Sequence, residues 1–372
     1  MNWNSTTVDA RTWTAAGERL RAGEASLISL WGEPSLAHMA VMEPSELRLL
    51  HLPCTANRLP SIGRLHPPAM RLERAMRDLF GLDADDAADR RPWLRHSGAY
   101  PFLPTEGESL HQIAVGPVHA GIIEPGHFRF TANGEAVVRL EQRLGYVHKG
   151  IDALMAGAAL DRAARLAGRI SGDSTVAYAL AFSHAVEMAS GVQVPPRAVW
   201  LRALFAELER LANHFGDIGA ICNDASFTIM HASFGLLREN VLRAAHACTG
   251  HRLMMDAVVP GGVRSDLPAE GIECLRAMIA LAHGQFPRLV DVYENTASLK
   301  DRTVGTGILS ESLARQFGAG GYVGRASGRA FDARRDPGYA PYHELEFQVP
   351  VVHAGDVNAR VWIRIQEVEQ SL

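Results

Sequence analysis

The stretch VPPRAVWLRALFAELERLANHFGDIGAIC, residues 194–222, predicts a long amphipathic helix. Pro195 and Pro196 mark its start, because proline is tolerated in the first turn of a helix and poorly in its interior. The apolar residues that follow are mostly three or four positions apart, which places them on one face. They are Val199, Leu204, Leu208, Leu211 and Phe215.

Two further segments, residues 234–255 and 270–296, repeat this helical pattern, and Gly, Pro and Asp occur in the connections. Long amphipathic helices joined by short connections form a bundle, because each helix buries its apolar stripe against the others. We therefore expect residues 146–300 to be mainly a helical bundle.

The N-terminal part of the chain has a different pattern. Residues 26–53 hold short apolar runs broken by Gly, Pro and Ser, which are typical of strands and turns. Residues 70–80 have helical spacing and are followed by Gly81, a common helix stop. Residues 83–108 are charged, contain Pro and Gly and show no period, so we expect a linker there.

A strand-rich segment opens the second predicted domain. Residues 127–143 alternate apolar and polar positions on both sides of Asn133-Gly134, a pair that favours a hairpin turn. The sequence thus predicts an α+β protein, with a small N-terminal α/β domain over residues 1–105. A large, mainly α-helical bundle domain with a flanking β-sheet is expected over residues 106–372.

Composition excludes several classes of protein. The net charge of −4 gives no broad basic surface, which argues against nucleic acid as a partner. The four cysteines form no Cys-x-x-Cys pair, so neither a structural zinc site nor an iron–sulfur cluster is predicted. No apolar run approaches the roughly 18 residues of a membrane helix, and the first residues do not resemble a signal peptide.

The glycine spacing of GAGGYVGRASG, residues 318–328, resembles a dinucleotide-binding turn. Such a turn follows a strand, whereas residues 310–317 have a helical pattern, so the sequence disfavours nicotinamide binding. Arginines and aspartates gather close by, and they either clamp an anion or pair with one another to hold the loop. They are Arg325, Arg329, Arg334, Arg335, Asp332 and Asp336.

Two histidines are candidates for chemistry. His119 precedes the predicted hairpin and either relays protons, since a histidine pKa lies near neutrality, or serves as a hydrogen-bonded structural residue. His214 falls beside Glu207 and Arg210 on the polar side of its helix, which is typical of either a surface network or a helix-packing network.

Seven segments, taken in order, resemble one family. They are GPVHAGIIEPGHFRFTANGE, LGYVHKGIDALMAG, VPPRAVWLRALFAELERLANH, GGVRSDLP, DRTVGTGILS, VGRASG and GDVNARVWIRIQEVEQSL. From about residue 111 to Leu372 the chain is thus similar to the large subunit of group 4, energy-converting nickel–iron hydrogenases and to its homologue in respiratory complex I, the forty-nine-kilodalton quinone-site subunit. The stretch RLERAMRDLFGL, followed by Arg90 and Arg91, resembles the small, thirty-kilodalton subunit of complex I.

The resemblance places the chemistry of the family at a small-residue loop. In the hydrogenases this loop is Arg-x-Cys-Gly-x-Cys, and its thiolates hold nickel and iron. Here Arg169 and Gly172 match, but Ser171 and Ser174 replace the thiols, and hydroxyls are poor ligands for such a centre. A family histidine falls on Tyr178. We therefore expect no nickel–iron centre and no other metal.

The similarity to complex I implies a quinone site instead. Gly116, Pro117 and His119 match a family loop whose second histidine contacts the quinone headgroup, and that second position falls on Ile123. In the small-residue loop, Asp173 either transfers protons or caps the helix that follows.

The resemblance thus implies a cavity for an electron acceptor, with a quinone as the candidate ligand. His119, Asp173 and Tyr178 are the candidate catalytic residues. The other residues expected to line the cavity are Arg169, Ser171, Gly172, Ser174, Arg325 and Asp332.

These features imply a subunit of a membrane-bound oxidoreductase similar to complex I. We expect the chain to bind no cofactor itself and to face an iron–sulfur small subunit similar to that of complex I. Other hydrophilic subunits and antiporter-like membrane subunits would hold it on the cytoplasmic, inner face of the cell membrane.

Two other functions stay open on the sequence. The chain either acts without catalysis, as a structural and coupling subunit, or, less favoured, is a true hydrogenase. We also expect a further C-terminal segment to carry the second cysteine pair of the family.

Overall fold

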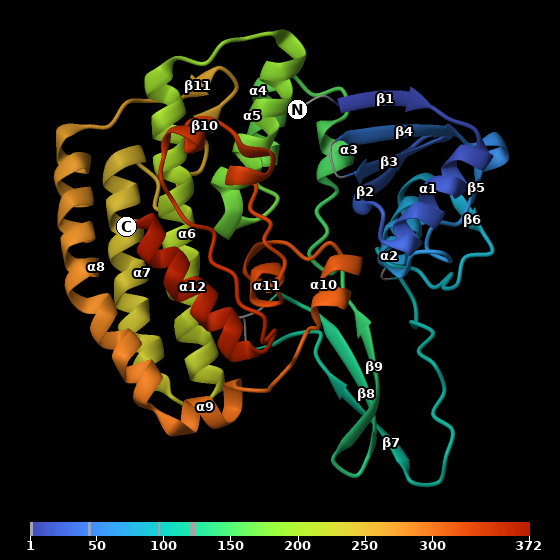
Figure 1. Cartoon of the computed structure of the whole chain (residues 1–372). Coiled ribbons are helices and arrows are strands. Elements are labelled where there is room, and N and C mark those ends of the chain that lie inside the picture. The colour runs from blue at the N-terminus through green and yellow to red at the C-terminus, as the bar shows by residue number, and fades with distance from the viewer. Residues whose placement is uncertain (1–2, 44–45, 96, 120–123) are drawn as a thin grey trace. The chain divides into compact units, whose positions relative to one another are not determined.

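The computed structural model describes residues 3–43, 46–95, 97–119 and 124–372. These residues form two compact units (Figure 1). The first is Met1–Lys149 with Arg315–Gly318, and the second is Gly150–Ala314 with Ala319–Leu372. The domain boundary expected near residue 105 stays a prediction, because these units are defined by spatial contacts and not by family likeness.

The first unit is built on a four-stranded sheet in the order β1-β4-β3-β2. Strand β1 runs parallel to β4, and the other neighbours are antiparallel. The strands are β1 (Trp3–Thr7), β2 (Ser26–Glu33), β3 (Leu36–Met42) and β4 (Leu47–Pro53). Trp13 of α1 (Ala10–Ala22) and Met76 of α2 (Met70–Phe80) join the buried core with side chains of this sheet. The predicted helix over residues 70–80 is confirmed, and Gly81 ends it with φ 70°.

A second, three-stranded sheet contains β7 (Leu110–Val115), β8 (His127–Asn133) and β9 (Ala136–Arg143). The predicted hairpin is confirmed, but its turn lies one residue later than expected. Asn133 pairs with Ala136, so Gly134 and Glu135 form the turn. Gly134 alone of Asn133 and Gly134 has a positive φ, 57°.

The predicted linker, residues 83–108, is tied down on two sides. It begins with β6 (Asp83–Asp85), which pairs with β5 (Arg58–Pro60). The guanidinium of Arg74 on α2 donates to the carbonyl of Arg91 and to the hydroxyl of Tyr100. Arg91 forms an ion pair with Glu141 of β9 at 2.6 Å. The segment is irregular because it is fixed by side chains rather than by a ladder of backbone hydrogen bonds.

The second unit is the predicted bundle. Helix α6 (Pro196–Asp224) packs on α7 (Thr228–Thr249), α7 on α8 (Ala269–Asn295), and α12 (Val357–Ser371) on α6 (Figure 1). The other α-helices and strands beyond Gly150 are all shorter than α6, α7 and α8. They are α3 (Ile151–Met155), α4 (Leu160–Ala167), α5 (Thr175–Ser190), β10 (Val258–Val259), β11 (Gly262–Val263), α9 (Ala297–Thr303), α10 (Glu311–Gln316) and α11 (Gly321–Ala326).

The glycine-rich stretch, residues 318–328, follows helix α10 and contains helix α11. A dinucleotide turn needs a strand before its glycines, so this part of the described chain does not support nicotinamide binding. Across the described ranges, every helix is too short or too polar to cross a bilayer.

Three buried phenylalanines meet where α6, α7 and α8 come together. The ring of Phe215 lies 5.6 Å from that of Phe286 and 6.3 Å from that of Phe234, between centroids. All three belong to the main core of the bundle.

We expect Phe234→Ala to lower the free energy of unfolding by about 3–5 kcal/mol, because it leaves a cavity in a close-packed core. Urea denaturation of the full chain measures this change. Leu236→Ala, on the same helix but 66% exposed, is the control and is expected to change stability by less than about 0.5 kcal/mol. Equal losses in the two variants would contradict this account of the core.

Candidate functional site

The small-residue loop leads directly into α5. Arg169 holds its start, because its two terminal nitrogens donate to the two carboxylate oxygens of Asp256 at 2.6 and 2.8 Å. The next residues make a short 3-10 turn, Gly172–Ser174. Within it, the hydroxyl of Ser171 donates to the carboxylate of Asp173.

The N-terminus of α5 is capped by a residue of another helix. Glu209 of α6 accepts the backbone N–H groups of Val176 and Ala177 at 2.7 and 3.0 Å. Ser174 occupies the N-cap position of α5, and its side chain makes no capping hydrogen bond among the described residues. The capping alternative for Asp173 is wrong, since Glu209 already satisfies these amides.

A cavity of about 610 Å³ opens beside this helix start, within the second unit. Helices α5 and α6 form two of its walls, and residues between Tyr322 and Tyr339 contribute to the third. The lining residues are Asp173, Ser174, Ala177, Leu180, Ala181, His184, Ala206, Glu209, Arg210, Asn213, His214, Asp217, Tyr322, Ala333 and Tyr339.

The predicted site residues are only partly brought together. Asp173 and Ser174 line the cavity. Tyr178 does not, because the turn of α5 leaves its side chain 41% exposed on the outer surface. Arg325 and Asp332 do not line it either, since both are buried in ion pairs with other residues.

The remaining predicted residues lie elsewhere. Gly172 lines a smaller neighbouring cavity. Arg169 and Ser171 are absent from the wall of the large cavity, because both side chains are engaged beside the loop. His119 belongs to the first unit, where its Nε2 lies 2.7 Å from the carbonyl oxygen of Gly126. Ile123 lies outside the described residues.

The residues of this chain do not fit a nickel–iron centre. Within the described ranges, no cluster of three or more His, Cys, Asp or Glu side chains could hold a metal ion. Cys222 and Cys248 are buried in the bundle core. Burial raises the pKa of both thiols to about 11, so neither is a thiolate at neutral pH.

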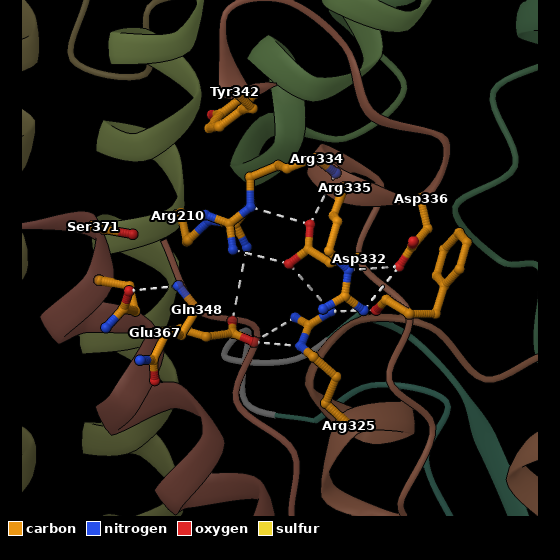
Figure 2. A network of polar contacts seen from close by, with 12 residues as sticks. Arg210, Arg325, Asp332, Arg334, Arg335, Asp336, Tyr342, Gln348, Glu367 and Ser371 are labelled. Carbon is orange, nitrogen blue, oxygen red and sulfur yellow. Dashed lines mark hydrogen bonds and ion pairs between the residues drawn. The ribbon is translucent and has the colours of Figure 1, made fainter. Parts of the chain in front are cut away.

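A buried carboxylate organises one side of the cavity. Glu367 of α12 is 0% exposed and receives Arg325 at 2.5 Å (Figure 2). It also accepts the Nε2–H of His214 at 2.6 Å. Burial alone would raise the pKa of Glu367, but the hydrogen bond from His214 and the charges of Arg325 and Arg210 bring it to about 2. Glu367 is therefore an anion at neutral pH.

The network continues through the arginine-rich loop. Asp332 pairs with Arg334 at 2.9 Å (Figure 2). Arg334 also reaches Glu207 of α6 at 3.1 Å. Glu207 also accepts the hydroxyls of Tyr342 and Ser371 at 2.6 and 2.5 Å. Of the two alternatives for this loop, the structure shows arginines that pair with acids and hold the loop in shape.

His214 connects the network to the cavity. Its ring is 6% exposed and lines the cavity. Since its Nε2–H donates to Glu367, its Nδ1 is the hydrogen-bond acceptor of the neutral ring, and within the described chain Nδ1 has no partner. Burial lowers the pKa of His214, which favours this neutral form.

Sequence reasoning missed most of the cavity wall. The packing network expected around His214 is present, but the cavity-facing role of this residue had no local signal. Glu209, Asn213 and Asp217 follow the i, i+4, i+8 spacing of one helix face, which could have indicated a shared polar wall. His184 carries no motif.

A second cavity of about 530 Å³ lies between α4 and the β10–β11 hairpin. Its charged lining residues are Asp161, Arg165, Asp256 and Arg264, and no residue predicted for the site lines it. Because Arg169 binds Asp256, this cavity adjoins the anchor of the small-residue loop.

Comparison with known proteins supplies a family context for this geometry. Residues 224–372 match the family described as the respiratory-chain NADH dehydrogenase, 49 Kd subunit. The D 1 subunit of NADH-quinone oxidoreductase from Roseiflexus sp. (strain RS-1) is 33% identical over 263 residues, which are 70% of each protein. The carbon monoxide-induced hydrogenase of Rhodospirillum rubrum is 31% identical over 71% of this chain and 73% of its own length.

A longer relative also matches. Formate hydrogenlyase subunit 5 of Escherichia coli (strain K12) is 31% identical over 341 residues, which are 84% of this chain. The chain spans 60% of the length of that relative.

We expect Glu367→Gln to destabilise the chain by about 3–5 kcal/mol at neutral pH, because it leaves buried Arg325 without its anion. The pKa of Glu367 falls from its ordinary 4.5 to about 2 on folding. Ionised Glu367 therefore stabilises the fold above about pH 4.5, and this contribution is lost as the pH falls towards 2.

The difference in unfolding free energy between wild type and Glu367→Gln should accordingly shrink over that pH range. Urea denaturation at several pH values measures it, with exposed Glu369→Gln on the same helix as the control. A difference that stays constant from pH 5 to about pH 2 would contradict the role given to the ionised carboxylate.

Proposed function

This chain belongs to the family that unites the 49 Kd subunit of respiratory-chain NADH dehydrogenase with related hydrogenases, and from this premise we propose that its cavity receives a quinone-type electron acceptor. The chain would act as one subunit of a membrane-bound oxidoreductase. The cavity of about 610 Å³ beside α5 and α6 is large enough for a ring-shaped headgroup.

The observation that carries the proposal is His214, a residue of the cavity wall whose buried Nδ1 has no partner among the described residues. A buried acceptor without a partner costs free energy, and a ligand hydroxyl would remove that cost. A quinol carries such hydroxyls. His184 and Arg210 add further polar groups to the same wall.

The rest of the wall suits an aromatic ring. Tyr322 and Tyr339 present aromatic side chains, and small residues leave room between α5 and α6. The small and aliphatic lining residues are Ala177, Leu180, Ala181, Ala206 and Ala333. These residues form the apolar part of a wall whose other residues are mostly charged or polar.

Reduction of a quinone to a quinol consumes two electrons and two protons. The family relationship suggests that the electrons would come from an iron–sulfur cluster on a partner similar to the small iron–sulfur subunit of complex I. Other hydrophilic subunits and antiporter-like membrane subunits would complete the complex on the cytoplasmic face of the membrane. The chain itself would supply the cavity and its polar groups.

The buried ion-pair network favours a second candidate function. The network joins α6 and α12 to Arg325 of α11 and to Arg334 without any ligand. Such a network suits a non-catalytic subunit that transmits movement between partners. A true hydrogenase has no comparable support, because serines occupy the thiol positions of the loop.

Calorimetric titration of the purified full chain with a short-chain ubiquinone tests the cavity proposal. We expect saturable binding that Ala181→Trp weakens by more than about tenfold, or about 1.4 kcal/mol, because the indole fills the cavity. Ala185→Trp is the matched control, since Ala185 lies on the same helix and does not line the cavity.

Binding that survives Ala181→Trp unchanged, or no saturable binding by the wild type, would overturn the proposal. Metal analysis of the same preparation separates the hydrogenase alternative, which requires stoichiometric nickel.

A further inference from the structure

Glu209 stands in a wall that two cavities share. Asp173, Glu209 and Asn213 line both the large cavity and a smaller one of about 10 Å³, which extends towards α7. Arg238 and Arg252 contribute to the far side of the smaller cavity. A space of this size holds about one water molecule. Most of its lining is apolar, and the polar side chains that could bind such a water are Asp173, Glu209, Asn213, Arg238 and Arg252.

Two opposing effects, hydrogen bonding and burial, make both protonation states of Glu209 accessible. Its two oxygens accept the N–H groups of Val176 and Ala177, and an anion is favoured at a helix N-terminus. Burial opposes the charge and, with a smaller contribution from the charge of Asp173, raises the pKa of Glu209 to about 7.

The charged groups around Glu209 come from several elements. Asp173, in the 3-10 turn, raises its pKa, and Arg210, one residue along α6, lowers it. Asn213 is neutral and donates to the backbone oxygen of Asp173 at 2.7 Å. The other ionisable groups on the two cavity walls are His184 of α5, His214 and Asp217 of α6, Tyr322 and Tyr339, Arg238 of α7 and Arg252.

We propose that Glu209 carries protons between these two cavities and delivers them to the acceptor in the larger one, an inference that rests on the proposed function. In each transfer the O–H bond of the Glu209 carboxylic acid breaks, and a new O–H bond forms on a quinone oxygen that has received electrons from the iron–sulfur partner. A proton from bulk solvent, relayed by water in the smaller cavity, then reprotonates the carboxylate, so no hydroxide is left behind.

The same step affects the small-residue loop. Once ionised, Glu209 accepts the two N–H groups at the start of α5 more strongly than it does as a neutral acid. Loss of its proton therefore tightens the junction between α6 and the loop of Asp173. Proton delivery and the firmness of this junction are therefore linked through the carboxyl group of Glu209.

Infrared difference spectroscopy of the full chain, titrated through neutral pH without any quinone, tests the inference. We expect a carboxylic-acid C=O band that disappears around pH 7 as Glu209 ionises. Glu209→Gln should abolish this band. Asp173→Asn should move its titration to lower pH, because the neighbouring negative charge is gone.

Glu273→Gln, at an exposed position of α8, is the matched control and should leave the titration unchanged. The inference fails if no band titrates near neutrality, if the band persists in Glu209→Gln, or if Asp173→Asn does not shift it. Should Glu209→Gln not fold, Asp173→Asn still decides, since it retains Glu209. This titration is independent of quinone binding, so its failure is distinguishable from failure of the proposed function.

Discussion

A carboxylate without access to water, that of Glu367, sets the geometry on which the cavity depends. An ion in a protein interior is tolerated only when cations and hydrogen-bond donors surround it. Arg325 and His214 meet that need, and they come from positions 42 and 153 residues away in the chain. Glu367 therefore holds α12 against α6 and binds Arg325 of helix α11 to both.

This constraint also explains the polar character of the cavity. Because Glu367 takes the Nε2–H of His214, the other ring nitrogen of this cavity-lining residue is left as a buried acceptor without a partner among the described residues. On the same helix α6, Glu209 caps α5, and Asp173 contacts Ser171 and Asn213. The family loop persists as a folded wall, although hydroxyls stand where a metal centre would need thiolates.

Local patterns in the sequence were sufficient for the elements and insufficient for the site. The two prolines and apolar stripe of residues 194–222 predicted α6, and Asn133-Gly134 predicted a hairpin within one residue. Such signals work because neighbours in sequence decide helix starts and turns. The partners of Arg325 and Arg334 lie on α6 and α12, so no local pattern could distinguish an anion clamp from a closed network.

The error about Asp173 has the same origin. A Ser or Asp residue before an apolar run commonly caps a helix, and the rule counts only the residues next to the helix. Here the cap arrives from Glu209, 33 residues after Val176. Tyr178 illustrates a related limit, because its place in a family motif did not reveal which side of α5 it would occupy.

Photoaffinity labelling tests the central claim most directly, that the space between α5 and α6 is the acceptor site. The assembled complex would be illuminated with an azido-quinone, and the labelled peptides of this chain identified by mass spectrometry. The account predicts adducts within residues 173–184 and 206–217 that excess unlabelled quinone prevents. Competed adducts confined to other parts of the chain, with these two segments unlabelled, would contradict it.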